Sequence, residues 1–448
     1  MDRSQLFKAL RKKHPYFIYE SFNIETGNDL TKIVFTFRMA GNIAFYPSIE
    51  FPTYSKINEH DLKNLAFHIG LVELISYWKA ACPPRVIIKP GSLNERQISW
   101  WKKLWFNGLG EFFYTNGIET NVEDFLKVEI ESDKIFESFQ FEANNKVLIP
   151  VGGGKDSVVS LELIKGAGLE VVPFILNPRE ASINSALSAG FVYADILQFK
   201  RTIHPELISL NNEGYLNGHT PFSALLAFVT LLAAKFSGAS YIALSNESSA
   251  NEATIPDTKI NHQYSKSYEF EKDFREYVAA YVSPGFNYFS FLRPLNELQI
   301  AKLFSGFPHH LHTFRSCNVG SKTDSWCGNC PKCLFTAIIL APFVGLEKLY
   351  TIFEKDIFEE NSLIRHLDEL TGVADEKPFE CVGTIDEVNA ALEFIINISK
   401  QTTLPVLLSH YHQKAKAGFP TFQNLLQQYN HENFLPAQFE EILKKALL

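Results

Sequence analysis

The sequence predicts an α/β protein whose central part is a parallel sheet, preceded by an α+β region and followed by a helical region. Three observations support this prediction. Short apolar runs alternate with helical segments from about residue 145 to 300, which is typical of strands joined by crossover helices. The preceding region mixes strand-like and helical periods, and the last hundred or so residues are mostly helical in period. We therefore predict domains at 1–140, 141–345 and 346–448.

The region before residue 140 contains apolar residues both at the spacing of strands and at the spacing of helices. The runs KIVFTFRM and IAFYPSIEF alternate or stay apolar as strands do, and AGN between them is typical of a turn. The segment DLKNLAFHIGLVELISYWKAA repeats its apolar residues at helical spacing and stops before CPPR. Together these segments predict an N-terminal α+β domain.

The central region contains the apolar runs KVLIPV, VVPFIL, ADILQF and YIALS, which have the length of buried strands. Because helical segments separate them, we expect a parallel sheet with crossover helices. The most apolar helical segment, FSALLAFVTLLAAKF, is about as long as a buried helix and has polar flanks. Beyond the centre, TIDEVNAALEFIINISK and PAQFEEILKKALL predict helices near the C-terminus.

The stretch NKVLIPVGGGKDSVVSLELIKGAG places three glycines, the glycine loop of residues 152–154, between a strand and a helix. Glycine permits positive φ angles and lets a phosphate approach bare backbone amides without a Cβ clash. The amides and the helix dipole favour an anion, Lys155 adds a cation, and Ser157 adds a hydroxyl donor. Asp156 would repel a phosphate unless a divalent cation bridged them, so the pattern indicates a nucleotide phosphate with Mg²⁺. The alternative is a structural turn with Asp156 as the helix N-cap.

The loop lacks the longer Walker pattern that ends in GK[ST], and it is not GxGxxG. It resembles the SGGxDS loop of the N-type ATP pyrophosphatases, the PP-loop superfamily, which wraps ATP phosphates while a substrate is adenylated. This resemblance implies catalytic roles for Lys155 and Asp156. The residues that it assigns to ATP binding are Gly152, Gly153, Gly154, Lys155, Asp156 and Ser157. Gly152 stands where the superfamily has serine, so one hydroxyl contact is missing.

A cysteine cluster follows the predicted sheet. RSCNVGSKTDSWCGNCPKCLF has the spacing C-x₉-C-x₂-C-x₂-C, contributed by Cys317, Cys327, Cys330 and Cys333. Four thiolates suit tetrahedral zinc, with an iron–sulfur cluster as the second choice. Redox or sulfur-transfer chemistry at one CxxC is a third interpretation. We predict a structural metal, and a similar cluster follows the ATP domain in the PP-loop nitrile synthase of the queuosine pathway.

Polar residues lie where strands of the central sheet end. SNESSANE follows the run YIALS, and His219 in NGHTPF precedes a helix. In a parallel sheet both segments fall at the carboxyl edge, where ligands bind. We predict that Ser245, Asn246 and Glu247 contact the nucleotide. Glu247 and Glu252 are either Mg²⁺ ligands or solvated loop carboxylates, and His219 is either a ligand or an ordinary helix-start residue.

The segment NHQYSKSYEFE is dense in side chains that can hydrogen-bond a polar ligand, although a surface helix start looks similar. Arg293 in FLRPLNEL and Arg315 in HTFRSC can grip a carboxylate or a diphosphate bidentately. A surface position is the common alternative for each arginine. We predict Tyr264, Arg293 and Arg315 as substrate-binding residues.

Composition narrows the class of protein. The 448 residues are 46% hydrophobic and 14% aromatic, which is typical of a well-folded chain. The net charge of −8, from 50 acidic and 42 basic residues, disfavours a nucleic acid as partner. The start MDRSQLFKALRKKHPYF lacks a signal-peptide core, no run approaches a membrane span, and six unevenly spread cysteines do not form a disulfide framework. We expect a cytoplasmic protein with a small-molecule partner and no membrane partner, and leave its oligomeric state open.

Nearly the whole chain resembles the UDP-N-acetylmuramoyl-L-alanyl-L-glutamate epimerases of bacterial cell-wall synthesis. The segments that carry the resemblance are FHIGLVELISYWKAACPP, QISWWKKLWFNGLGEFFY, PVGGGKDSVVSLELIK, ALSNESSANE and NHQYSKSYEFE. It implies ATP- and Mg²⁺-dependent inversion of the terminal L-glutamate of the UDP-muramoyl dipeptide to D-glutamate, with release of AMP and pyrophosphate. We therefore expect ATP and Mg²⁺ as cofactors beside the structural Zn²⁺.

The implied chemistry agrees with the residue types. A free carboxylate makes the neighbouring α-proton hard to remove, whereas an acyl-adenylate lets the resulting anion delocalise into the carbonyl. A base can then take the proton, and an acid on the other face can return it. The candidates for this proton transfer are His219, His262, Tyr264 and Lys266.

Two other functions stay open on the sequence. One is a PP-loop adenylating ligase acting on a deazapurine or tRNA, against which the acidic balance and the long N-terminal region argue weakly. The other is a non-catalytic nucleotide-binding zinc protein, which only the glycine at position 152 supports.

Overall fold

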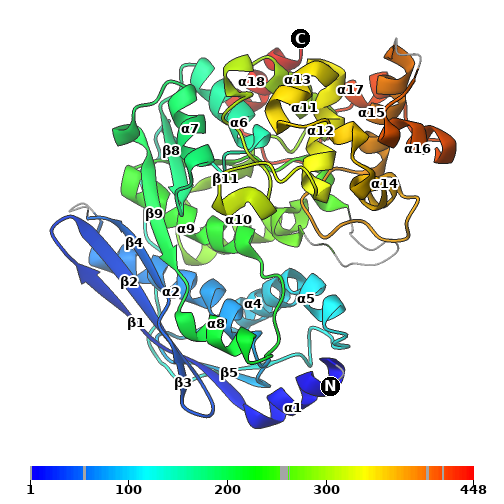
Figure 1. Ribbon diagram of the computed structural model, residues 1–448. Coiled ribbons are helices and arrows are strands. Elements are labelled where there is room, and N and C mark those ends of the chain that lie inside the picture. The colour runs from blue at the N-terminus through cyan, green and yellow to red at the C-terminus, as the bar shows by residue number, and fades with distance from the viewer. Residues whose placement is uncertain (1–2, 54–56, 253–260, 262, 400–402, 416–417) are drawn as a thin grey trace.

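Our computed structural model describes residues 3–53, 57–252, 261, 263–399, 403–415 and 418–448. Within them the strands form one mixed sheet of eleven strands, in the order β11-β10-β7-β8-β9-β4-β2-β1-β5-β6, with β3 paired to β2 (Figure 1). The strands are β1 (Tyr16–Thr26), β2 (Leu30–Met39), β3 (Ile43–Phe45), β4 (Ser48–Pro52), β5 (Arg85–Ile88), β6 (Lys127–Ile130), β7 (Val147–Pro150), β8 (Val171–Leu176), β9 (Leu197–Thr202), β10 (Tyr241–Leu244) and β11 (Asn287–Ser290).

The half of the sheet from β11 to β9 pairs in parallel throughout. Helices connect its strands, as the alternation of apolar runs and helical segments indicates. The helices of this part are α6 (Lys155–Gly166), α7 (Glu180–Ser188), α8 (Pro205–Asn212), α9 (Phe222–Ser237), α10 (Tyr268–Tyr281) and α11 (Glu297–Ser305). The four strands predicted from apolar runs in this region and the buried helix α9 are confirmed.

The N-terminal half of the sheet is mostly antiparallel and is joined to the parallel half through β4 and β9. Ile49 of β4 pairs with Arg201 of β9 in antiparallel register. Beside this join, Phe51 packs on Phe199 with ring centroids 5.0 Å apart. Treating the two regions as separate domains does not anticipate this shared sheet. The helices of the N-terminal region are α1 (Arg3–Lys13), α2 (Glu59–Glu73), α3 (Ile75–Trp78), α4 (Glu95–Gly108) and α5 (Gly110–Thr115).

The parallel strands bury both faces, which explains their continuous apolar sequences. Leu148 of β7 and Ile242 of β10 belong to a core that they share with α9, α10 and the N-terminal helices. Their neighbours Ile149 and Ala243 point to the opposite face, because side chains alternate along a strand. That second core includes apolar residues of α6, α11 and the C-terminal helices.

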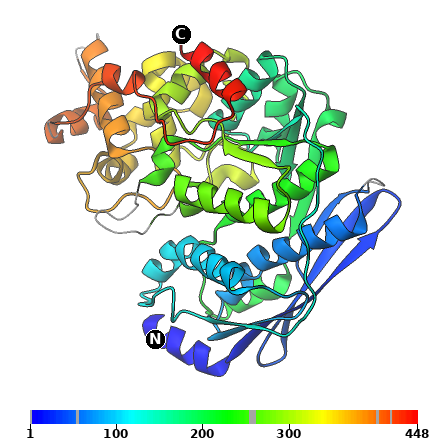
Figure 2. The same ribbon diagram turned by 180° about the vertical axis from the view of Figure 1, so that it is seen from behind.

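The described part of residues 346–448 is helical, as predicted, and packs against the second face of the sheet. Phe439 shows this placement, because its ring centroid lies 5.1 Å from that of Tyr241 and 4.6 Å from that of Phe289. Figure 2 shows this last helix beside the parallel strands. The α-helices from residue 331 onward are α12 (Pro331–Val344), α13 (Leu346–Phe353), α14 (Ile364–Thr371), α15 (Ile385–Ile398), α16 (Val406–Lys414), α17 (Phe422–Leu426) and α18 (Ala437–Leu447). Every helix among the described residues is too short or too polar to cross a lipid bilayer.

Candidate active site

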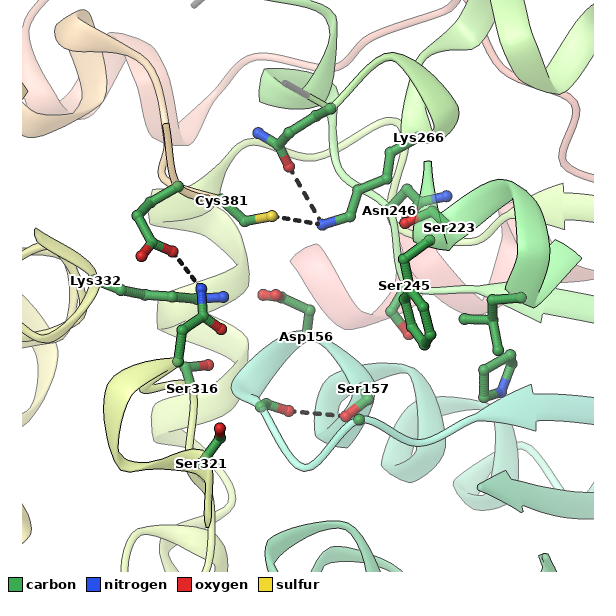
Figure 3. A pocket seen from close by; sticks show the side chains of 18 of the residues that line it. Asp156, Ser157, Ser223, Ser245, Asn246, Lys266, Ser316, Ser321, Lys332 and Cys381 are labelled. Atoms are coloured by element: carbon green, nitrogen blue, oxygen red, sulfur yellow. Dashed lines mark hydrogen bonds between the residues drawn. The ribbon is translucent and has the colours of Figure 1, made fainter. Parts of the chain in front are cut away.

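A cavity of about 500 Å³ lies at the carboxyl ends of β7 and β10 (Figure 3). The chain runs from β7 to β8 and β9 on one side of β7 and returns to β10 and β11 on its other side. In open α/β sheets a crevice forms where the strand order reverses in this way, and ligands bind there. The cavity therefore occupies the topological switch point of the parallel half.

The glycine loop turns sharply between β7 and α6 beside this cavity. Gly153 has a φ of +88°, and a Cβ there would lie 2.9 Å from the backbone carbon of Ala181. A Cβ at Gly154 would lie 2.7 Å from Oγ of Ser316. The backbone N–H of Arg315 donates to the carbonyl of Gly153 at 2.8 Å. The fold thus requires glycine at position 153, whereas at position 154 rotation of the Ser316 hydroxyl could make room for a Cβ. Contacts to Ala181 and Arg315 hold the loop between two distant segments.

The first turn of α6 offers backbone amides to the cavity. Gly154 is its N-cap and has no side chain that could accept from them. Gly152, Gly154, Asp156 and Ser157 line the cavity, and Oγ of Ser157 donates to the carbonyl of Gly154 at 2.9 Å. Open amides at the positive end of a helix dipole favour an anion, so this geometry suits a phosphate group.

Lys155 is not among the described residues that line the cavity. Its side chain is 5% exposed and forms ion pairs with Asp156 and with Glu297, the first residue of α11. Burial lowers the pKa of Lys155, but the charges of these two carboxylates outweigh burial and leave the pKa above its ordinary value. The ammonium therefore balances the buried carboxylate of Glu297 and the partly exposed carboxylate of Asp156.

Three carboxylates converge behind the loop. One oxygen each from Asp156, Glu247 and Glu297 lie within 4.8 Å of one another, and of the three Asp156 lines the cavity. Carboxylate oxygens are ligands that Mg²⁺ accepts, usually with phosphate oxygens and water completing the shell. Glu252 lies apart from this group, because its carboxylate pairs with Lys377. Lys155 already pairs with Asp156 and Glu297, so within this set Asp156, which also faces the cavity, is the carboxylate placed to bind a divalent cation.

The carboxyl end of β10 supplies a second wall. Ser245 and Asn246 line the cavity, and Nδ2 of Asn246 donates to Oγ of Ser290 at 3.0 Å. Oγ of Ser245 is buried and has no hydrogen-bond partner within the described chain. A buried hydroxyl normally has a partner, so a polar ligand group would satisfy Ser245.

The predicted proton-transfer residues do not share one location. His219 lines the cavity, with Nδ1 3.6 Å from a carboxylate oxygen of Glu111. Lys266, at the end of the short 3₁₀ helix η3 (Tyr264–Lys266), also lines it. Tyr264 is only 7% exposed and not part of the described lining, and burial raises its pKa to about 12. His262 lies outside the described residues.

The two predicted substrate-binding arginines differ in position. Arg315 lines the cavity, with its guanidinium donating to the carbonyls of His312 and Phe314 at 3.0 and 2.8 Å. Arg293 is fully buried and absent from the described lining. Its guanidinium donates to the backbone carbonyls of Glu247 and Lys266, which holds together the loops that carry those residues.

Sequence reasoning did not predict the cavity residues Arg179, Lys332 and Cys381, nor the acidic residues Asp324 and Glu380. Arg179 follows β8 at the same carboxyl edge, so the edge argument that found Ser245 applies to it as well. Lys332 lies between Cys330 and Cys333, in a segment whose spacing indicates a metal site and gives no sign of a ligand-binding lysine. Cys381 stands alone in the sequence and carries no local signal. Arg179 and Lys332 join Lys266 and Arg315 as four cations of the lining, beside the carboxylates of Asp156, Asp324 and Glu380. The four cations can pair with negative groups of a ligand.

The cysteine cluster lies against one side of the cavity through Cys317. One Sγ each from Cys317, Cys327, Cys330 and Cys333 all lie within 4.8 Å of one another. The closest pairs are Cys317 with Cys330 at 3.9 Å and Cys327 with Cys333 at 3.8 Å. Tetrahedral zinc with Zn–S bonds of ~2.3 Å separates its sulfurs by ~3.8 Å. Backbone N–H groups of Gly320 and Asn329 point at the sulfurs of Cys317 and Cys327, as suits thiolates.

The chain matches two domains of one protein family. Residues 8–291 match the MurL N-terminal domain, and residues 313–423 match the MurL C-terminal domain. A UDP-N-acetyl-alpha-D-muramoyl-L-alanyl-L-glutamate epimerase from Xanthomonas oryzae pv. oryzae is 34% identical over 332 residues, which are 72% of each chain. Proteins of the same name from a Micromonospora species and from Salinispora tropica are 34% and 33% identical, over 76% and 74% of this chain and 76% and 73% of their own.

Proposed function

The chain belongs to the MurL family, and on that basis we propose that it inverts the terminal L-glutamate of UDP-N-acetylmuramoyl-L-alanyl-L-glutamate to D-glutamate. The protein is thus an isomerase. The observation that carries the proposal is the shared identity with relatives named for this activity, along most of both chains. The ligase and non-catalytic alternatives find no support in these relatives.

ATP activates the substrate in this proposal. The terminal carboxylate attacks the α-phosphorus of ATP, pyrophosphate leaves, and the carboxyl group becomes an acyl-adenylate. Loss of the carboxylate charge lets a base remove the α-proton, because the electron pair then delocalises into the acyl carbonyl. A proton returned to the opposite face inverts the centre, and hydrolysis of the mixed anhydride releases AMP.

The glycine loop is our proposed phosphate site, in a domain of the PP-loop kind. The amides of the first turn of α6, with Ser157, would bind phosphate oxygens. Mg²⁺ would be held by Asp156, with Glu247 and Glu297 behind it, and would offset the charge of the phosphates. The cationic side chains of Arg179, Lys332 and Arg315 would neutralise the rest of the ligand's charge.

A structural zinc ion at the cysteine cluster completes the proposal. Its thiolates link the segment at Cys317 to the start of α12, and both segments border the cavity through Cys317 and Lys332. Metal binding would hold these segments in place, because ligand–metal bonds contribute folding free energy. Chemistry on the ion itself is not part of the mechanism, since four protein ligands leave no open position.

The product of this reaction is a nucleotide-linked precursor of peptidoglycan, so we place the protein in cell-wall synthesis in the cytoplasm. The test is to incubate the purified protein with ATP, Mg²⁺ and the UDP-linked L-Ala-L-Glu substrate, hydrolyse the product and separate the glutamate enantiomers. We expect D-glutamate together with AMP and pyrophosphate. L-glutamate alone after complete ATP consumption would contradict the epimerase assignment, and AMP formed equally well from a deazapurine acid would favour the ligase.

A further inference from the structure

A loop from the C-terminal region reaches the cavity and brings a cysteine to it. This C-terminal loop, residues 372–384 between α14 and α15, contributes Phe379, Glu380 and Cys381 to the lining. Its Lys377 donates to the carbonyl of Gly383 at 2.9 Å and pairs with Glu252 near the end of β10. One of these contacts stabilises the loop internally, and the other connects it to the segment that follows β10 in the parallel half of the sheet.

The same loop also contacts the N-terminal region. Tyr114 of α5 donates a hydrogen bond to the carboxylate of Glu376, and its ring centroid lies 5.8 Å from that of Phe379. Three parts of the chain therefore meet around Cys381. Its position in the cavity follows from contacts on both sides of the loop.

Cys381 meets Lys266 inside the cavity. Nζ of Lys266 lies 3.3 Å from Sγ of Cys381 and 3.2 Å from Oε1 of Gln263. Figure 3 shows Lys266 and Cys381 reaching toward each other, with Asp156 of the glycine-loop helix below them. A phosphate bound near Asp156 would therefore lie in the same cavity as this pair.

The contact between Lys266 and Cys381 favours a different protonation state in each residue. Burial lowers the pKa of Lys266, but the nearby charges of Cys381 and Glu247 outweigh burial and leave the pKa above its ordinary value. A lysine held as ammonium has no lone pair with which to accept a proton. An adjacent ammonium conversely favours the thiolate form of a cysteine, which is a competent base.

The other cysteines are placed for other purposes. Cys82 is fully buried in the N-terminal core. Cys317 borders the cavity, but its sulfur accepts the backbone N–H of Gly320 and lies 3.9 Å from the sulfur of Cys330. Cys381 is the cysteine whose sulfur faces a cation in the cavity rather than other sulfurs.

We propose that Cys381 transfers the α-proton on one face of the activated glutamate and that Lys266 positions and charge-balances its sulfur. This assignment rests on the proposed function. The Cα–H bond breaks, an S–H bond forms, and the electron pair moves into the acyl carbonyl. A proton from a second acid then bonds to Cα on the opposite face, and His219, one of the predicted proton-transfer candidates, lines the same cavity. In the reverse direction Cys381 is the donor.

The test separates activation from proton transfer in three variants. Cys381→Ser keeps a hydrogen-bonding side chain of similar size but replaces the thiolate by a hydroxyl that stays protonated at neutral pH. We expect AMP formation with the dipeptide substrate within about threefold of wild type, and deuterium uptake at the glutamate Cα in D₂O reduced by about 100-fold or more. Cys381→Ala should behave in the same way. Asp375→Asn, exposed on the same loop and outside the cavity lining, should keep both activities.

Alkylation provides a measurement on the unaltered fold. Iodoacetamide at neutral pH should modify Cys381, as located by peptide mass spectrometry, and deuterium uptake should fall in step with that modification while AMP formation persists. Near-normal uptake in Cys381→Ser, or equal loss of AMP formation and uptake in a folded variant, would overturn the assignment alone. A wild-type protein that does not invert the substrate would overturn the proposed function and this assignment with it.

Discussion

Lys155 and Glu297 form a buried ion pair directly beneath the glycine loop, with both side chains 5% exposed. The pair joins the first turn of α6 to the first residue of α11, so it links two helices on the same face of the sheet. Its lysine also reaches Asp156, which faces the cavity. The position of Asp156, the proposed Mg²⁺ ligand, thus depends on a lysine that is not part of the described cavity lining.

We predict that Lys155→Met destabilises the protein by about 3–5 kcal/mol, because it leaves the carboxylate of Glu297 buried without its partner. Urea denaturation measures the loss. Adding Glu297→Gln to the same chain removes the unpaired charge and should recover most of the stability. A single variant as stable as wild type would show that the pair does not support the fold. Lys155→Ala or Lys155→Met should also abolish AMP formation, through the displaced Asp156.

Asp156→Asn should behave differently, because Asp156 is partly open to the cavity. We expect AMP formation to fall by about 100-fold or more, since the amide is a poor ligand for the cation that offsets the phosphate charge. The melting temperature should stay close to that of wild type. Turnover near the wild-type rate would place the ATP phosphates somewhere other than at the glycine loop.

Cys327→Ser or Cys330→Ser should lower metal content and thermal stability together, because a structural metal contributes folding free energy. Elemental analysis of the purified protein and a thermal melt give the two readings. Cys381→Ser is the matched control: it removes a thiol outside the cluster and should retain the metal. Purified wild-type protein with neither zinc nor iron would refute the metal site.

Turnover in D₂O should place deuterium on the glutamate Cα, and this uptake should require ATP. An unactivated carboxylate leaves the α-proton too weakly acidic to exchange, so mass spectrometry of the recovered glutamate should show no label without nucleotide. A ligase would retain the original hydrogen. Labelling that proceeds equally well without ATP would refute the activation step.

Acid should destabilise the protein through His68. Burial lowers the pKa of His68 to about 4, and its Nδ1 lies 2.9 Å from the carbonyl oxygen of Asn64. An unfolded chain has a histidine pKa of ~6.5, so between these values the unfolded state binds more protons. The free energy of unfolding should therefore fall by about 3 kcal/mol as pH drops from about 6.5 to 4.

Urea denaturation across this pH range isolates the contribution of His68. His68→Phe removes the titrating group and should lose less stability between neutral and acid pH than wild type does. His412→Gln, at an exposed histidine, should follow the wild-type curve. A His68→Phe curve parallel to that of wild type would assign the acid loss to other groups.

Local spacing was sufficient for the glycine loop and the cysteine cluster. A turn between a strand and a helix depends on residues that are close together in the chain, and so does a set of cysteines spaced for chelation. The geometry of both features can therefore be predicted from the local sequence. The strands at the β7, β8, β9 and β10 runs follow from apolar patterning for the same reason. Each of these features is short-range.

Packing decided which side chains meet in the cavity. Lys155 and Arg293 have the residue types of ligand-binding groups, yet buried carboxylates and backbone carbonyls hold them outside the described lining. Cys381 has no local pattern and reaches Lys266 because a loop from the C-terminal helices is tied to both other parts of the chain. The pairing of β4 with β9 is of the same kind. Such contacts join segments far apart in sequence, and their free energy depends on surfaces that exist only once the chain has folded.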